Sequence, residues 1–134
     1  MAPDHSDFIA KYDREITGDF ARSFYGDSGF YNIGDWRGMD PTISNMVAAC
    51  EALVQRLADT DSDTDKTGCK DILDVACGLG ATTASLARTY PNAAVHGSNI
   101  SEVQIKAAQD RCPSHRMTRP SCLRRSSRPL WTLC

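Results

Sequence analysis

The sequence lacks the features by which a chain enters or crosses a membrane. Its 134 residues contain no run of 18 or more apolar residues, so a transmembrane helix is not expected. Residues 1–7 have neither a basic nor an apolar segment, and a secretory signal peptide is not expected either. These absences favour a cytoplasmic protein, and the length suits one domain with a single core.

Metal-binding patterns are also missing. No Cys-x-x-Cys pair occurs among the six cysteines, and Cys112 and His115 form one ligand pair without a second to complete a zinc site. Without a secretion signal, the thiols are expected to be reduced. Histidine is scarce: His96 falls in an expected strand, and His5 and His115 lie near the chain ends. We therefore assign no catalytic residue and expect no bound metal.

Acidic residues are absent from residue 112 onward. That segment carries five arginines, whereas residues 1–111 have a net charge of −7. Residues 113–134 show no apolar periodicity, so we expect an irregular, disordered basic tail and no third strand. Arginine contacts with nucleic acid are an alternative that we do not favour. The abrupt change also suggests that the reading frame or the splicing departs from the ancestral one near Pro113.

Residues 1–58 are expected to form an N-terminal helical segment with an aromatic lid, and positions 8–36 are unusually aromatic. Phe8, Tyr12 and Ile16 recur every four residues and predict a helix, after which several glycines indicate turns. The aromatic residues of these turns either close over a ligand as a lid or pack the edge of the domain. They are Tyr25, Phe30, Tyr31 and Trp36.

A second helix and a linker follow. Asp40-Pro41 predicts a helix start, and apolar residues at three- and four-residue spacing continue to Leu57. Residues 59–70 form an acidic linker. Its alternating aspartates resemble a calcium loop, but Lys66 and Ile72 occupy the positions that require glycine and glutamate. No calcium site is expected.

Residues 71–112 contain two strand–helix units. Strands are predicted at 71–76 and 93–97, and helices at 81–89 and from Ser101 to about residue 111. Ser101 and Gln104 have the spacing of a capping box. Strands that alternate with helices indicate an α/β fold with parallel pairing.

The turn after the first strand has the composition of a ligand site. Gly78 and Gly80 allow the backbone to approach a bound molecule, and Asp74 precedes them with a carboxylate that can accept hydrogen bonds from an amino group. A dinucleotide-binding turn would have a third glycine where Thr83 stands, and no lysine completes a phosphate-binding P-loop.

The same run resembles motif I of the class I S-adenosylmethionine (SAM)-dependent methyltransferases, Asp/Glu-x-Gly-x-Gly-x-Gly, with Ala76 in place of the first glycine. In the family this turn holds the methionine part of SAM. The second unit resembles the family's next strand end, where an acidic residue commonly binds the ribose hydroxyls and where Asn99 stands here. The aromatic segment around Tyr31 is similar to the part of small-molecule methyltransferases that closes over SAM. The resemblance thus implies these cofactor-binding residues: Asp74, Ala76, Cys77, Gly78, Gly80, Asn99, Ile100, Gln104 and Tyr31.

The resemblance implies the N-terminal part of a Rossmann-like class I methyltransferase fold: N-terminal helices, the first two β–α units and an incomplete sheet. The implied function is methyl transfer from SAM to a small molecule of secondary metabolism, with no membrane partner. Two alternatives stay open at this point. The chain is a truncated, non-catalytic remnant, or it needs a partner chain that completes the sheet.

Overall fold

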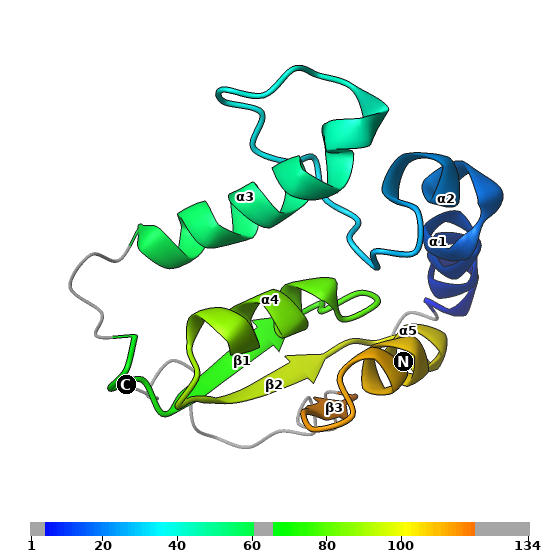
Figure 1. Ribbon diagram of the computed structural model, residues 1–134. Coiled ribbons are helices and arrows are strands. Elements are labelled where there is room, and N and C mark those ends of the chain that lie inside the picture. The colour runs from blue at the N-terminus through cyan, green and yellow to red at the C-terminus, as the bar shows by residue number, and fades with distance from the viewer. Residues whose placement is uncertain (1–4, 61–65, 120–134) are drawn as a thin grey trace.

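The computed structural model describes residues 5–60 and 66–119 and confirms an α/β fold with an open parallel sheet (Figure 1). The N-terminal helix and the two β–α units lie close to where the sequence predicts them. In chain order the elements are α1 (Ser6–Thr17), α2 (Asp19–Tyr25), the 3₁₀ helix η1 (Ile43–Asn45), α3 (Met46–Asp59), β1 (Asp71–Val75), α4 (Ala81–Thr89), β2 (Ala94–Ser98), α5 (Glu102–Arg111) and β3 (Arg116–Thr118).

The sheet has the order β1-β2-β3, and all its pairs are parallel. Val75, the last residue of β1, pairs with Ser98, the last residue of β2, so both strands end at the same level. Helix α4 lies between the sheet and α3, while α1 and α2 lie beyond the carboxyl ends of the strands (Figure 1). This is the edge where open α/β sheets bind ligands.

Two apolar clusters hold these layers together. One joins α3 and α4 to the segment after α2, and Phe30 is buried in it against Cys50 and Val54. Phe30 is therefore a core residue of the domain edge and not part of a lid. The other cluster joins the turn after β1, α5 and β3, with Cys77, Ala108, Cys112 and Met117 buried together.

Strand β1 has little cover on one face. Its side chains alternate between exposed and half-buried, and Leu73 and Val75 are 57% and 71% exposed. Among the described residues, only β2 pairs with β1. Strands of parallel sheets normally have both faces covered by helices. The exposed face of β1 therefore departs from this rule within the described part of the chain.

The helix predicted to start at Asp40-Pro41 starts later. The carbonyl oxygen of Asp40 accepts hydrogen bonds from Thr42 N (2.8 Å) and Asn45 Nδ2 (3.1 Å), which closes a turn. The 3₁₀ helix begins after this turn and leads into α3 at Met46. Asp40 thus supports the entry to the helix through its backbone and does not cap the first residue.

The third strand is a correction to the prediction that none follows residue 111. Its first residue, Arg116, pairs with His96 of β2. The side chain of Gln109 on α5 holds the chain in position for this strand. Its Nε2 donates to the carbonyl oxygens of Cys112, Pro113 and His115, and its Oε1 accepts from Met117 N at 3.2 Å. One side-chain amide thus connects the end of α5 to β3. Apolar periodicity in the sequence does not reveal such hydrogen bonds.

We expect Gln109→Ala to lower the free energy of unfolding by about 1–3 kcal/mol, because it leaves part-buried backbone groups without partners. Urea denaturation measures this loss, and hydrogen exchange should show faster exchange at Met117 in particular. The matched control is Asp110→Ala, next in the helix and exposed, which removes only a surface ion pair with Lys106. Equal loss of stability in both variants would contradict this role of Gln109.

Candidate functional site

The turn between β1 and α4 has a backbone that ordinary residues rarely adopt. Ala76, Gly78 and Gly80 have φ values of 61°, 55° and 89°. Two hydrogen bonds fix the turn: Cys77 N donates to Ser98 O of β2, and Gly80 N donates to Cys77 O, both at 3.0 Å. Helix α4 begins directly after Gly80. The first N–H groups of a helix have no partner within it, so the turn ends at a site that favours negative groups.

The two glycines of the turn serve different purposes. A Cβ on Gly80 would lie 2.9 Å from Ala108 Cα of α5, so the absence of a side chain lets α5 pack directly on the turn. A Cβ on Gly78 would meet only Ile16 Cδ1, at an ordinary contact distance of 3.7 Å. Gly78 is thus needed for its backbone conformation, and the side chain next to it comes from α1.

Asp74 lies at the base of the turn. Its half-buried carboxylate accepts a hydrogen bond from Thr83 Oγ1 at 2.7 Å. Burial raises the pKa of Asp74, and the Thr83 hydrogen bond opposes that shift. Thr83 is fully buried on α4, at the position where a dinucleotide-binding turn has its third glycine. The sequence analysis treated Thr83 only as a missing glycine, whereas its hydroxyl orients the carboxylate of the site.

Cys77 is a structural residue of the turn. Its side chain is buried, and burial, with a smaller contribution from the charge of Asp74, raises the pKa of the Cys77 thiol to about 11. The thiol is therefore neutral near pH 7 and is not a nucleophile.

The end of β2 carries a closed polar network. Asn99 Oδ1 accepts from Ser101 N (3.0 Å), and Asn99 Nδ2 donates to Gln104 Oε1 (2.9 Å). Ser101 caps α5 by accepting from Gln104 N at 3.1 Å, as the capping-box pattern predicts. Gln104 Nε2 then donates to Asp13 Oδ1 of α1 at 2.6 Å. Asp13 is a residue of this site that the sequence analysis missed.

The expected site residues therefore fall into three groups. Asp74, Ala76, Cys77, Gly78 and Gly80 form the turn. Asn99 and Gln104 form the network at the end of the neighbouring strand, and Ile100 beside them is 48% exposed and makes no polar contact through its side chain.

Tyr31 forms the third group and packs against α1 and α2. Its ring packs edge-on against Tyr12 of α1, with centroids 5.9 Å apart, and lies tilted against the ring of Tyr25 of α2, with centroids 5.4 Å apart. Trp36 is turned to its own loop, where its Nε1 donates to Ile33 O at 2.8 Å. Of the aromatic residues for which both a lid and a packing role were considered, Tyr25 and Tyr31 thus pack beside α1.

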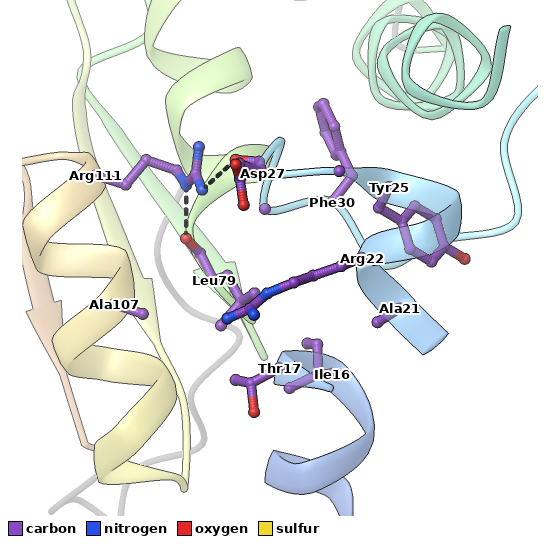
Figure 2. A pocket seen from close by; sticks show the side chains of 12 residues that line it. Ile16, Thr17, Ala21, Arg22, Tyr25, Asp27, Phe30, Leu79, Ala107 and Arg111 are labelled. Carbon is purple, nitrogen blue, oxygen red and sulfur yellow. Dashed lines mark hydrogen bonds between the residues drawn. The ribbon is translucent and has the colours of Figure 1, made fainter. Parts of the chain in front are cut away.

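A cavity of about 170 Å³ lies on the α5 side of the turn (Figure 2). It is bounded by α1, α2 and α5, and it meets the turn at Leu79. Arg111 closes it by donating from Nε to Leu79 O (3.1 Å) and from Nη2 to Asp27 O (2.8 Å). The cavity is smaller than typical ligand pockets, and neither Asp74 nor Asn99 lines it. We therefore place the candidate site at the strand ends, under α1, and not in this cavity.

Metal and membrane features can be judged for the described residues only. Within residues 5–60 and 66–119, no three histidine, cysteine or acidic side chains lie close enough to hold a metal ion together. Over the same ranges, no helix is both long and apolar enough to span a bilayer.

The comparisons with known proteins agree with this geometry. Residues 72–128 match a family described as a methyltransferase domain. The fold is similar to that of the cyclopropane synthase MmaA2 from Mycobacterium tuberculosis, with a TM-score of 0.59 and 23% identity over 87% of this chain and 39% of that one. Among curated proteins, none matches the chain significantly.

Two further structures were solved with the cofactor or its product. The mycolic acid cyclopropane synthase CmaA1, complexed with S-adenosylhomocysteine (SAH), has a TM-score of 0.58 and 25% identity over 89% of this chain and 40% of that one. Magnesium protoporphyrin IX methyltransferase from Synechocystis, with bound SAM, has a TM-score of 0.54 and 18% identity over 87% and 54%. The chain thus spans from about two fifths to about half of the length of these proteins.

These findings confirm the resemblance drawn from the two strand–helix units and the Rossmann-like fold that it implies. The family match also extends past Cys112 to residue 128. The methyltransferase pattern therefore continues into the segment that the sequence analysis assigned to an irregular tail. The other residues of that segment, from 120 on, lie outside the described part of the chain.

The strained backbone of Ala76 gives a direct test of the turn. We expect Ala76→Gly to raise the free energy of unfolding by about 0.5–1 kcal/mol, because relief of the left-handed strain exceeds the added flexibility of the unfolded chain. Chemical denaturation measures the change. The same substitution at the exposed helical Ala48 should lower stability by about 1 kcal/mol. A loss of stability at both positions would mean that Ala76 is not strained.

The raised pKa of Asp74 gives a pH dependence with a defined sign. A carboxyl group whose pKa is raised on folding contributes stability below its unfolded value of about 3.8, and that contribution is lost as the pH rises through the folded pKa. The substitution Asp74→Asn replaces the carboxyl with a group that does not ionise, so the variant does not lose stability in this way as the pH rises. We expect the variant to become progressively more stable than the parent chain as the pH is raised from about 4 to 7.

Urea denaturation at several pH values measures the difference for Asp74→Asn. Asp71→Asn, on the exposed start of the same strand, is the matched control. If the difference between the parent and Asp74→Asn stays constant with pH, burial does not control the ionisation of Asp74.

Proposed function

We propose that this chain, which carries the N-terminal part of a class I SAM-dependent methyltransferase, binds SAM at the carboxyl ends of β1 and β2 and serves methyl transfer to a small molecule. The observation that carries the proposal is the orientation of Asp74 by Thr83 beneath a left-handed turn that opens onto the N-terminus of α4.

The groups at this turn fit the methionine part of SAM. The carboxylate of Asp74 has one oxygen bonded to Thr83, which leaves acceptor positions for an ammonium group. The N-terminus of α4 favours a carboxylate nearby. At Gly78 the backbone is accessible, because among the described residues only the side chain of Ile16 comes close to it. An amino acid with both charges is thus matched by groups of opposite sign.

When bound, SAM supplies a methyl group on a positively charged sulfur. Transfer by in-line displacement depends chiefly on holding the two reactants in line and excluding water. The part of this function that we assign to the chain is therefore binding and orientation of the cofactor. Asp74 and the turn hold its amino-acid end, and α1 lies over the site to limit access of water.

We assign no general base to the chain. His96 lies in the middle of β2, and its Nε2 is 4.0 Å from Asp71 Oδ1 at the opposite end of β1 from the turn. His115 Nδ1 is 3.1 Å from the hydroxyl of Ser114, outside the strand-end site. If the acceptor must lose a proton, we propose that the base comes from outside the residues described.

The acceptor is proposed as a small molecule of secondary metabolism. The small size of the acceptor is supported by two structural neighbours at 18% identity, because coclaurine N-methyltransferase and magnesium protoporphyrin IX methyltransferase are both named for small-molecule acceptors. Their acceptors differ in kind, so the identity of the acceptor here is a matter for a substrate screen. The cytoplasmic location expected from the sequence stays a prediction.

A second candidate function rests on the exposed face of β1. Leu73 and Val75 present apolar side chains to solvent on a strand with one described neighbour. This favours the alternative that the chain is a binding protein whose sheet is completed by a partner chain. Under this alternative the chain would hold SAM without transferring its methyl group alone.

Titration calorimetry with SAM tests the proposed site. We expect the full chain to bind SAM and Asp74→Asn to weaken binding about 10- to 100-fold, because the variant loses a charged hydrogen bond to the ammonium group. Asp71→Asn should bind like the parent. Absence of binding at millimolar SAM, or the same weakening in both variants, would refute the site.

Methyl transfer itself needs a separate measurement. Radiolabelled SAM incubated with a panel of amine, phenol and carboxylic acid acceptors should yield a labelled product if the chain is a complete enzyme. Binding of SAM without product across the panel would favour the partner-dependent alternative.

A further inference from the structure

We propose that Asp13 of α1 supplies the carboxylate that binds the vicinal diol of the SAM ribose, a role that the end of β2 leaves unfilled. The inference rests on the proposed function, because it assigns a further residue to the same cofactor site. It concerns an interaction between the N-terminal helix and the end of β2, 91 positions apart in the chain.

The end of β2 offers no acid of its own. Asn99 stands there, and its amide is used within the protein: Oδ1 accepts from Ser101 N and Nδ2 donates to Gln104 Oε1. The side chain is also 92% covered, since only 8% of its surface is exposed. Asn99 therefore helps to orient Ser101 and Gln104 and is poorly placed to bind a sugar directly.

Gln104 extends this hydrogen-bond network to α1. It is 1% exposed, and its Oε1 is taken by Asn99. Its Nε2 donates to Asp13 Oδ1 at 2.6 Å. Both polar residues at the strand end thus serve to orient one carboxylate, and that carboxylate is the accessible end of the chain of hydrogen bonds.

The carboxylate of Asp13 has capacity left for a ligand. An ionised carboxylate accepts about four hydrogen bonds, and Gln104 is the side chain that donates to it within the described part of the chain. Asp13 is only half-buried, whereas Asn99 and Gln104 are buried. Two adjacent hydroxyl groups of a ribose present two donors that suit one carboxylate.

The position of α1 supports the assignment independently. Ile16, three residues after Asp13 and on the same face of the helix, is the side chain closest to the Cβ position of Gly78. Helix α1 therefore reaches the turn proposed for the methionine part and the strand end proposed for the ribose. Tyr12, beside Asp13, packs against Tyr31, which anchors the helix in this position.

The test compares two ligands, SAH and its 2′,3′-dideoxy analogue, by titration calorimetry on the full chain. The parent chain should bind SAH more tightly than the analogue. Asp13→Asn should weaken SAH binding about 10- to 100-fold and binding of the analogue less than threefold, because only SAH offers the diol. Asp7→Asn, an exposed acid in the first turn of the same helix, is the matched control and should change neither.

The remaining outcomes are distinct. Equal weakening of both ligands by Asp13→Asn would overturn the inference, since it would mean that Asp13 only anchors α1. Tighter SAH binding by Asp13→Asn would also overturn it, because Asp13 would then compete with the ribose for Gln104. If Asp13→Asn unfolds, Asp13→Glu keeps the charge and should retain preference for SAH. If the parent binds neither ligand, the proposed function itself fails.

Discussion

The backbone hydrogen bond from Cys77 to Ser98 is the contact on which the candidate site depends. It ties the turn after β1 to the last residue of β2, so the two strand ends act as one rigid edge. The left-handed conformations at Ala76, Gly78 and Gly80 follow from the need to leave the strand, meet this bond and start α4 within a few residues. The close approach of Ala108 to Gly80 then fixes α5 against the same turn. A change in this bond would therefore alter the turn from which α4 starts and on which α5 packs.

The N-terminal helix is the second determinant of the site. It contacts the turn through Ile16 and the end of β2 through Asp13, and it is held by aromatic contacts of Tyr12. The helix itself is exposed over most of its surface, with Ile16 as its buried residue. Its position therefore depends on a few specific contacts and not on a large apolar interface. Segments held in this way separate from a domain at a lower free energy than its core does.

Much of this architecture could be predicted because its signals are local. The glycines, the acid before them, the apolar strands and the Ser101 cap lie within a few residues of the elements that they specify. What the sequence analysis missed depends on distant partners. Gln109 positions β3 through hydrogen bonds to backbone atoms on both sides of a turn. Asp13 and Gln104, which share a hydrogen bond, are 91 positions apart in the sequence. Thr83 was missed for another reason: it was compared with a glycine of a different family, so its own hydroxyl was not considered. Trp36 is aromatic like a lid residue, but its ring nitrogen is satisfied within its own loop.

The open face of β1 has a consequence for how the protein behaves at high concentration. Leu73 and Val75 lie on a strand that pairs with β2 alone among the described residues, so its other edge can pair with the same strand of a second molecule. The sequence Asp71-Ile72-Leu73-Asp74-Val75 contains two acids, and like charges on two paired copies of this strand would repel each other. These acids therefore favour the separate chain over the stacked one. The same acid that prepares the turn for a ligand also acts as a gatekeeper against self-association.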